Sequence, residues 1–130
     1  MTTPLKRIMH IDDDPIVRKI TERILVENGG FTVQSYEGGV PAQKDFHVFA
    51  PQLILIDFLM PEMDGPAVLD FLQGGEKTRV PAVFLTGKNE ESLIKQYAPC
   101  GVIGFIHKPY KPDELIETII GLWQSFIRSD

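Results

Sequence analysis

The sequence predicts an α/β domain in which one five-stranded parallel sheet is covered by helices on both faces. Short runs rich in Val, Ile, Leu and Phe alternate with longer helix-type segments, and this alternation occurs five times. The run Leu53–Ile56 contains no polar residue, as expected of a central strand that is buried on both faces. With 130 residues, of which 43% are hydrophobic, the chain has the size and apolar content of a single domain spanning residues 1–130.

The order of the elements follows from these runs and from the residues at their ends. The expected strands are Arg7–Ile11, Phe31–Ser35, Leu53–Asp57, Ala82–Thr86 and Ile103–His107. The expected helices are Pro15–Asn28, Val40–Ala50, Gly65–Gln73, Asn89–Ala98 and Pro112–Arg128. Asp14 followed by Pro15 is typical of a helix N-terminus, because Asp caps the first turn and Pro fits its first position. This repetition of strand and helix predicts a doubly wound fold, in which helical crossovers join parallel strands.

The composition and charge of the chain argue against several classes of function. The net charge is −5, which argues against direct binding of nucleic acid, since that usually requires a basic patch. The single cysteine, Cys100, cannot form a disulfide within the chain and suits a reducing compartment. No apolar run approaches the roughly 20 residues that span a bilayer, and Met1–Lys6 lacks the apolar core of a signal peptide. We therefore expect a cytoplasmic protein that binds neither membrane nor nucleic acid.

Charged and polar side chains follow four of the five expected strands. Asp12 and Asp13 come after the first strand, Asp57 ends the third, Thr86 ends the fourth, and Lys108 follows the fifth. In open parallel sheets, binding sites form beyond the carboxyl ends of the strands. We expect these three acids, one hydroxyl and one ammonium group to converge at that edge.

Three neighbouring carboxylates repel one another unless a cation lies between them. Mg2+, or Mn2+ in its place, suits this set, because Mg2+ takes one or two carboxylates together with water and phosphate oxygens. Asp57 would then remain ionised and could attack phosphorus, while the metal and Lys108 neutralise charge on the transferring group. Thr86 could donate a hydrogen bond to the product. The pattern predicts metal-dependent phosphoryl transfer to Asp57.

Four motifs in order carry a resemblance to a known family. They are the acidic run after the first strand, the stretch Leu55–Gly65, the step Leu85-Thr86-Gly87, and the segment Phe105–Tyr110. With them, the chain resembles the response-regulator receiver domains, in particular the single-domain chemotaxis regulators, from Lys6 to about Ile127. The resemblance implies a flavodoxin-like fold with strand order 2-1-3-4-5.

The resemblance also implies roles for the acids. Asp57 would be the phosphoacceptor, taking the phosphoryl group from a phosphohistidine on a sensor histidine kinase or a histidine phosphotransfer protein. Asp13 would bind the metal directly and Asp12 mainly through water, while Asp57 and the backbone carbonyl of Leu59 complete the set. The domain would accept a phosphoryl group, with at most slow self-dephosphorylation, and would not be an enzyme.

The remaining motif residues would transmit the signal. Lys108 would pair with the phosphoryl group, and its bond to Pro109 would be cis. Thr86 and Phe105 would be the switch pair, Thr86 moving toward the phosphoryl group and the ring turning inward. The altered surface would then act on a downstream protein target or an output domain. Gly87 departs from the commonest family pattern, where alanine is frequent.

The last helix leaves two interpretations open. Leu115, Ile119, Leu122 and Phe126 form a stripe suited to burial against the sheet. A second stripe lies beside it: Ile116, Ile120, Trp123 and Ile127. The second stripe either packs on neighbouring helices or is a docking face. Family resemblance favours partner binding, including formation of a homodimer, on the face made by the fourth helix, fifth strand and fifth helix.

Three rival functions are weighed against the receiver hypothesis. A phosphatase with an aspartyl nucleophile has a similar sheet but needs a second acid two residues after the nucleophile, where this chain has Leu59. A receiver-like interaction module that is never phosphorylated would not need the set of Asp57, Thr86 and Lys108. A flavin-binding module is disfavoured because Asp12 and Asp13 would repel a nucleotide.

Overall fold

Five parallel strands form one sheet in the computed structural model, in the order β2-β1-β3-β4-β5. The structure describes residues 3–60, 63–73, 80–87, 96–97 and 101–128. The strands are β1 (Arg7–Ile11), β2 (Thr32–Tyr36), β3 (Leu53–Asp57), β4 (Ala82–Thr86) and β5 (Val102–His107). The doubly wound fold and the order implied by the family resemblance are both confirmed.

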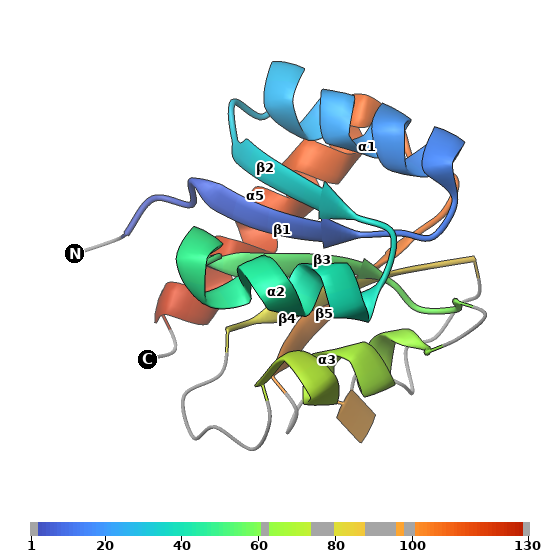
Figure 1. The fold of residues 1–130 in the computed structure, drawn as a ribbon. Helices are drawn as coiled ribbons and strands as arrows, with labels where there is room; N and C mark the ends of the chain where they lie inside the picture. The colour runs from blue at the N-terminus through green and yellow to red at the C-terminus, as the bar shows by residue number, and fades with distance from the viewer. Residues whose placement is uncertain (1–2, 61–62, 74–79, 88–95, 98–100, 129–130) are drawn as a thin grey trace.

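Helices cover both faces of this sheet. They are α1 (Pro15–Glu27), α2 (Gly39–Phe49), α3 (Gly65–Gln73) and α5 (Pro112–Arg128). Helices α1 and α5 lie on one face, and α2 and α3 lie on the other (Figure 1). The helix expected at Asn89–Ala98 falls almost entirely outside the described residues. Among the helices that are described, none has both the length and the hydropathy needed to cross a membrane.

The predicted N-terminus of α1 is confirmed in detail. The carboxylate of Asp14 accepts hydrogen bonds from the backbone N–H groups of Ile16 (2.9 Å) and Val17 (3.2 Å). Pro15 occupies the first helical position, where its missing N–H is not needed. This cap holds the start of α1 directly against the acidic run that follows β1.

Four elements differ from the expectation by one residue at one or both ends: α1, β2, α2 and β5. Two of these shifts have a visible cause in the hydrogen bonds. Strand β2 begins at Thr32, because the N–H of Phe31 bonds to the Leu25 carbonyl (3.2 Å) and so belongs to the end of α1. Helix α2 ends at Phe49, because Ala50 adopts a left-handed conformation with φ of 50° while its N–H still bonds to the Phe46 carbonyl. Neither shift changes which residues reach the carboxyl edge of the sheet.

The apolar core is divided by the sheet into two clusters. One lies beneath α2 and α3, and the other beneath α1 and α5. The residues of β3 from Leu53 to Ile56 alternate between the two clusters, and all of them are fully buried. The prediction that this run is a central strand is confirmed. Burial of these four side chains fixes the position of β3 and therefore of Asp57 at its end.

The second stripe of α5 is not a continuous exposed face. Ile116 and Trp123 are 9% and 8% exposed, so these two side chains pack within the molecule. The indole N–H of Trp123 donates a hydrogen bond to the carbonyl of Thr3 at 2.8 Å. Ile120 is 38% exposed and Ile127 is half-buried. The docking interpretation is therefore wrong for Ile116 and Trp123, since burial already uses their apolar surface.

Candidate functional site

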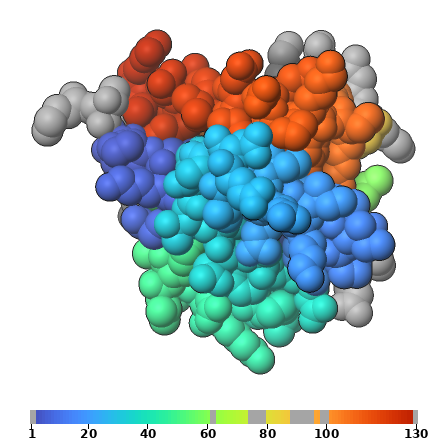
Figure 2. Space-filling view, turned by 90° about the horizontal axis from the view of Figure 1, so that it is seen from above, coloured from blue at the N-terminus to red at the C-terminus, as the bar shows by residue number. Residues whose placement is uncertain are grey.

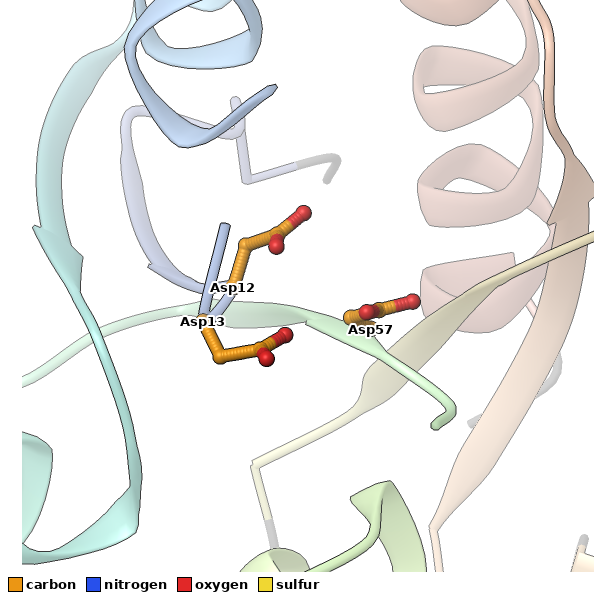
Figure 3. Close-up of side chains that lie close together, drawn as sticks. All are labelled: Asp12, Asp13 and Asp57. Atoms are coloured by element: carbon orange, nitrogen blue, oxygen red, sulfur yellow. The ribbon is translucent and has the colours of Figure 1, made fainter. Parts of the chain in front are cut away.

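Three carboxylates meet at the carboxyl edge of the sheet. Asp12 and Asp13 directly follow β1, and Asp57 is the last residue of β3. These strands are neighbours in register, with Ile11 opposite Ile56, so their ends lie together. One oxygen of each acid lies within 4.8 Å of one oxygen of each of the others. Figure 3 shows the three side chains close together beyond the ends of β1 and β3.

Asp12 is the most constrained of the three acids. Asp12 is fully buried, and its carboxylate oxygen Oδ1 accepts a hydrogen bond from the backbone N–H of Asp14 at 2.9 Å. The other oxygen, Oδ2, is buried without a hydrogen-bond partner, and the ammonium of Lys108 lies 3.7 Å from it. A buried charged oxygen is costly unless it is paired. The orphaned Oδ2 is therefore well suited to a divalent cation held with Asp13 and Asp57.

Lys108 bridges two of the acids. Its ammonium lies 3.1 Å from Oδ1 of Asp57 and 3.7 Å from Oδ2 of Asp12. The backbone N–H of Lys108 donates to the carbonyl of Thr86 at 2.8 Å, which holds the start of this loop on the end of β4. The peptide bond from Lys108 to Pro109 is cis. The convergence expected for Asp12, Asp13, Asp57 and Lys108 is thus observed.

The site carries more negative charge than Lys108 alone compensates. Burial raises the pKa of the Asp57 carboxyl, and the hydrogen bond and charge of Lys108 offset part of this increase. Burial likewise raises the pKa of Asp12, which the Asp14 N–H and Lys108 partly offset. Burial lowers the pKa of Lys108, but its bond to Asp57 and the nearby carboxylates outweigh that effect and raise it overall. Lys108 therefore stays positively charged at neutral pH.

The two predicted switch residues, Thr86 and Phe105, lie on the neighbouring strands β4 and β5. Thr86 ends β4, is 3% exposed, and is the register partner of His107. Phe105 is half-buried in β5, and its ring lies 5.4 Å from that of Phe84 and 6.3 Å from that of Phe58. Phe105 thus packs on the α2–α3 side of the sheet. The switching role of the pair stays a prediction.

Leu59 lies two residues beyond Asp57, and its side chain is exposed at 62%. Its assignment as a backbone metal ligand also stays a prediction. The exposed apolar side chain offers no second acid at this position. That absence removes the proton donor that an aspartyl phosphatase would need there.

Two residues near the site had no functional assignment from sequence. The guanidinium of Arg18 donates to the backbone carbonyl of Asp12 at 2.8 Å, which fixes the acidic loop from the first turn of α1. His10 is fully buried, with Nδ1 3.1 Å from the hydroxyl of Ser35 and Nε2 without a partner. Burial, followed by the charges of Lys108 and Arg18, lowers the pKa of His10 to about 3. Long helical side chains point back toward the N-terminus, a rule that could have identified Arg18.

Comparison with known proteins places this geometry in a family. A family model, the response regulator receiver domain, matches residues 8–120. The chain belongs to the response regulator receiver family. It is therefore a receiver domain of two-component signalling, a family that is not catalytic, and membership implies a histidine kinase as partner.

Individual relatives agree with this assignment. The chain is 31% identical over 114 residues to the chemotaxis protein CheY of Bacillus subtilis, covering 87% of this chain and 93% of that protein. It is also 31% identical to the regulatory protein AtoC of Escherichia coli, covering 87% of this chain but 24% of AtoC. The chain thus spans about a quarter of AtoC.

Solved structures of receiver proteins share the fold. The chemotaxis protein CheY4 of Vibrio cholerae superposes with a TM-score of 0.80 at 20% identity, covering 92% of this chain and 99% of that one. The receiver domain of a signal transduction histidine kinase from Syntrophus aciditrophicus gives 0.73 at 30% identity, covering 92% and 91%. At 20% identity, the likeness to CheY4 concerns the fold alone.

Proposed function

We propose that Asp57 accepts a phosphoryl group from a phosphohistidine on a sensor histidine kinase or a histidine phosphotransfer protein, and that this reaction requires Mg2+ or Mn2+. The observation that carries the proposal is the position of the Asp57 carboxylate. It lies within 4.8 Å of Asp12 and Asp13 oxygens and 3.1 Å from the Lys108 ammonium. A nucleophile, a set of metal ligands and a cation are therefore present together at the carboxyl edge of the sheet.

Each group has a defined part in the transfer. An oxygen of Asp57 forms a bond to phosphorus, while the bond from phosphorus to the donor imidazole nitrogen breaks and its electron pair leaves with the imidazole. Asp12, Asp13, Asp57 and the Leu59 carbonyl would hold the metal, which neutralises charge on the phosphoryl oxygens when bound. The ammonium of Lys108 leaves its direct bond with Asp57 and pairs with a phosphoryl oxygen instead. Thr86 donates a hydrogen bond to the product.

The output is a change of surface. Phosphorylation adds about −1.5 to −2 charges at Asp57. This added charge draws Thr86 and Lys108 toward the phosphoryl group and biases an equilibrium in which the Phe105 ring turns inward. The altered surface acts on a downstream protein target or an output domain, and β5 with α5 would contribute to a homodimer face. In the second stripe of α5, Ile120 and Ile127 keep exposed surface.

The direct test is chemical labelling of Asp57. Acetyl phosphate with Mg2+ should add one base-labile phosphoryl group to the wild type, measured by intact mass, and none to Asp57→Asn. Asp70→Asn is the matched control, because Asp70 is an exposed acid of α3 outside the acidic cluster. Equal labelling of the wild type and Asp57→Asn would refute the assignment of Asp57. An unlabelled wild type would instead favour the unphosphorylated interaction module.

A further inference from the structure

A pair of partly buried hydroxyl groups joins the loop that carries Lys108 to helix α1. The phenol oxygen of Tyr110 and the hydroxyl oxygen of Thr21 are 2.6 Å apart, a short distance for a hydrogen bond between two hydroxyls. The two residues are 89 positions apart in the chain. Thr21 is 1% exposed, and the Tyr110 ring packs against the core cluster beneath α1 and α5. The bond is therefore partly shielded from water.

This bond completes the attachment of the Lys108 loop. On the near side, the backbone N–H of Lys108 is bonded to the Thr86 carbonyl at 2.8 Å. On the far side, two residues later, the Tyr110 ring and hydroxyl are held by α1. The main chain of Lys108 is thus fixed at both ends. A lysine side chain can adopt many rotamers. Fixing its main chain restricts the positions that the ammonium group can reach.

Helix α1 also holds the loop of Asp12, one of the two acids that Lys108 contacts. Asp14 caps the helix, and Arg18 donates to the Asp12 carbonyl at 2.8 Å. Thr21 lies one turn further along the same helix. The acidic loop and the Lys108 loop are therefore both tied to α1, which lies beside α5 on this face of the molecule (Figure 2). The distance between the Lys108 ammonium and the Asp12 carboxylate therefore depends on α1, to which both loops are bonded.

The Tyr110 phenol also lies within the electrostatic influence of the site. Burial raises its pKa, and the hydrogen bond with Thr21 and the charge of Lys108 lower it in part. Asp12 and Asp57 raise it further. The net increase keeps the phenol protonated at neutral pH, so the hydrogen bond with Thr21 is retained there.

We propose that the hydrogen bond between Thr21 and Tyr110 positions the ammonium of Lys108 against Asp57 and Asp12, so that both residues are positioning residues for phosphoryl transfer. This inference rests on the proposed function, in which Lys108 stabilises the transferring group. Without the bond, Tyr110 keeps its ring packing but loses its hydrogen bond to α1. The ammonium then spends less time near Asp57, and the transfer slows because misplacement of a stabilising charge is costly.

Two substitutions remove one hydroxyl each at nearly constant volume. Tyr110→Phe and Thr21→Val should each lower the rate constant of labelling by acetyl phosphate at saturating Mg2+ by about 3- to 10-fold. The double variant should lose no more than either single one, because one bond is broken in every case. Thr21→Ser keeps a hydroxyl and should retain the wild-type rate. Labelling of Tyr110→Phe at the wild-type rate would overturn the proposal.

Tyr36→Phe is the matched control. Its hydroxyl donates to the Asp45 carboxylate at 2.8 Å, on the α2 side and away from Lys108. This variant also loses a tyrosine hydroxyl that is hydrogen-bonded in the native structure, and it should be labelled at the wild-type rate. Slowing equal to that of Tyr110→Phe would show a general response to a lost hydroxyl and would contradict a specific positioning role.

A metal titration separates positioning from a general loss of stability. The Lys108 ammonium competes with a cation for Asp12 and Asp57 oxygens, so a displaced ammonium should tighten Mg2+ binding by about 2- to 5-fold in Tyr110→Phe, measured by calorimetry. In a Lys108→Met background, Tyr110→Phe should have no further effect. An equal effect in both backgrounds would mean that Tyr110 does not act through Lys108.

The titration does not require phosphorylation. A chain that is never phosphorylated would still show the coupling between Tyr110 and Lys108, while the labelling test on the wild type would fail. Failure of the proposed function and failure of the positioning role are therefore distinguishable. A lower melting temperature of Tyr110→Phe with unchanged Mg2+ affinity would assign the bond to folding alone and overturn the proposal.

Discussion

At the scale of single residues, Asp12 shows how the site accumulates unfavourable charge. Its Oδ2 is buried without a hydrogen bond, and the nearest cation, Lys108, is shared with Asp57. An unpaired charge in such a place is normally removed by protonation or by a counter-ion. The raised pKa of Asp12 reflects this, with burial as its largest cause. The metal-free protein keeps the cluster at a cost in stability.

Asp13 provides the test of this cost. It is exposed and shares the cluster with Asp12 and Asp57. In chelator, Asp13→Asn should raise the melting temperature by a few degrees, because one repulsive charge near 4 Å in water is worth about 1 kcal/mol. The measurement is thermal unfolding followed by circular dichroism. With saturating Mg2+ the order should reverse, since the wild type gains more from the ion.

The control for Asp13→Asn is Asp70→Asn. It changes the net charge equally but removes an acid that lies outside the cluster. A melting temperature of Asp13→Asn in chelator at or below the wild-type value would show that repulsion among the three acids does not limit stability.

At the scale of elements, the start of α3 is pressed against the end of β3. The N–H of Gly65 donates to the Phe58 carbonyl at 2.9 Å. A Cβ atom at Gly65 would lie 2.7 Å from Cε1 of Phe84 and 3.1 Å from the carbonyl oxygen of Asp57. Real Cβ atoms do not approach so closely, so glycine is needed for this contact. The packing of α3 is thus linked directly to the backbone of Asp57.

Gly65→Ala should destabilise the protein by about 1 to 3 kcal/mol, because the ring of Phe84 or the backbone of Asp57 must move. Gly121→Ala is the matched control. Gly121 lies within α5 with no heavy atom within 4 Å of an added Cβ, so its substitution should stabilise by about 0.5 to 1 kcal/mol. Urea unfolding measures both. Equal stability of Gly65→Ala and the wild type would contradict the close contact.

At the scale of the whole molecule, the pH dependence of folding contains contributions of opposite sign. Burial lowers the pKa of His10 to about 3 from 6.5, so between these values the unfolded chain binds a proton that the native chain does not. Stability from this residue is complete above pH 6.5 and is lost as pH falls toward 3. Asp12 and Asp57 have raised native pKa values, so they contribute stability as pH falls through those values.

His10→Leu isolates the first contribution. Between pH 6.5 and 4.5, the free energy of unfolding of the wild type should fall relative to this variant by about 2 to 3 kcal/mol, at 1.36 kcal/mol per pH unit. Denaturant unfolding at several pH values in chelator gives the difference, and the Asp12 and Asp57 contributions cancel in it. His47→Leu, which replaces an exposed histidine, is the control. Parallel curves for the wild type and His10→Leu would contradict the buried, uncharged state of His10.

The local pattern of residues was sufficient to predict the sheet and the residues that lie together at its carboxyl edge. Strand β3 could be recognised as central because four consecutive apolar residues need burial on both faces, and all four are fully buried. Asp12, Asp13, Asp57 and Lys108 could be placed together because parallel strands end at one edge. The shifted boundaries at Phe31 and Ala50 could not be foreseen, since an apolar residue and a good helix former there gave no sign of helix-end hydrogen bonds.

Contacts between distant segments were decided only when the chain folded. The bond of Tyr110 to Thr21 joins residues 89 apart, and that of Trp123 to Thr3 joins residues 120 apart. Periodicity reports which face of a helix is apolar, but not which surface covers it. For that reason the stripe containing Trp123 remained ambiguous until the structure showed Ile116 and Trp123 buried and Ile120 exposed. The sequence alone thus predicted the fold and the residues at the carboxyl edge of the sheet. Packing between segments far apart in the chain decided which apolar side chains stay exposed and so can contact a partner.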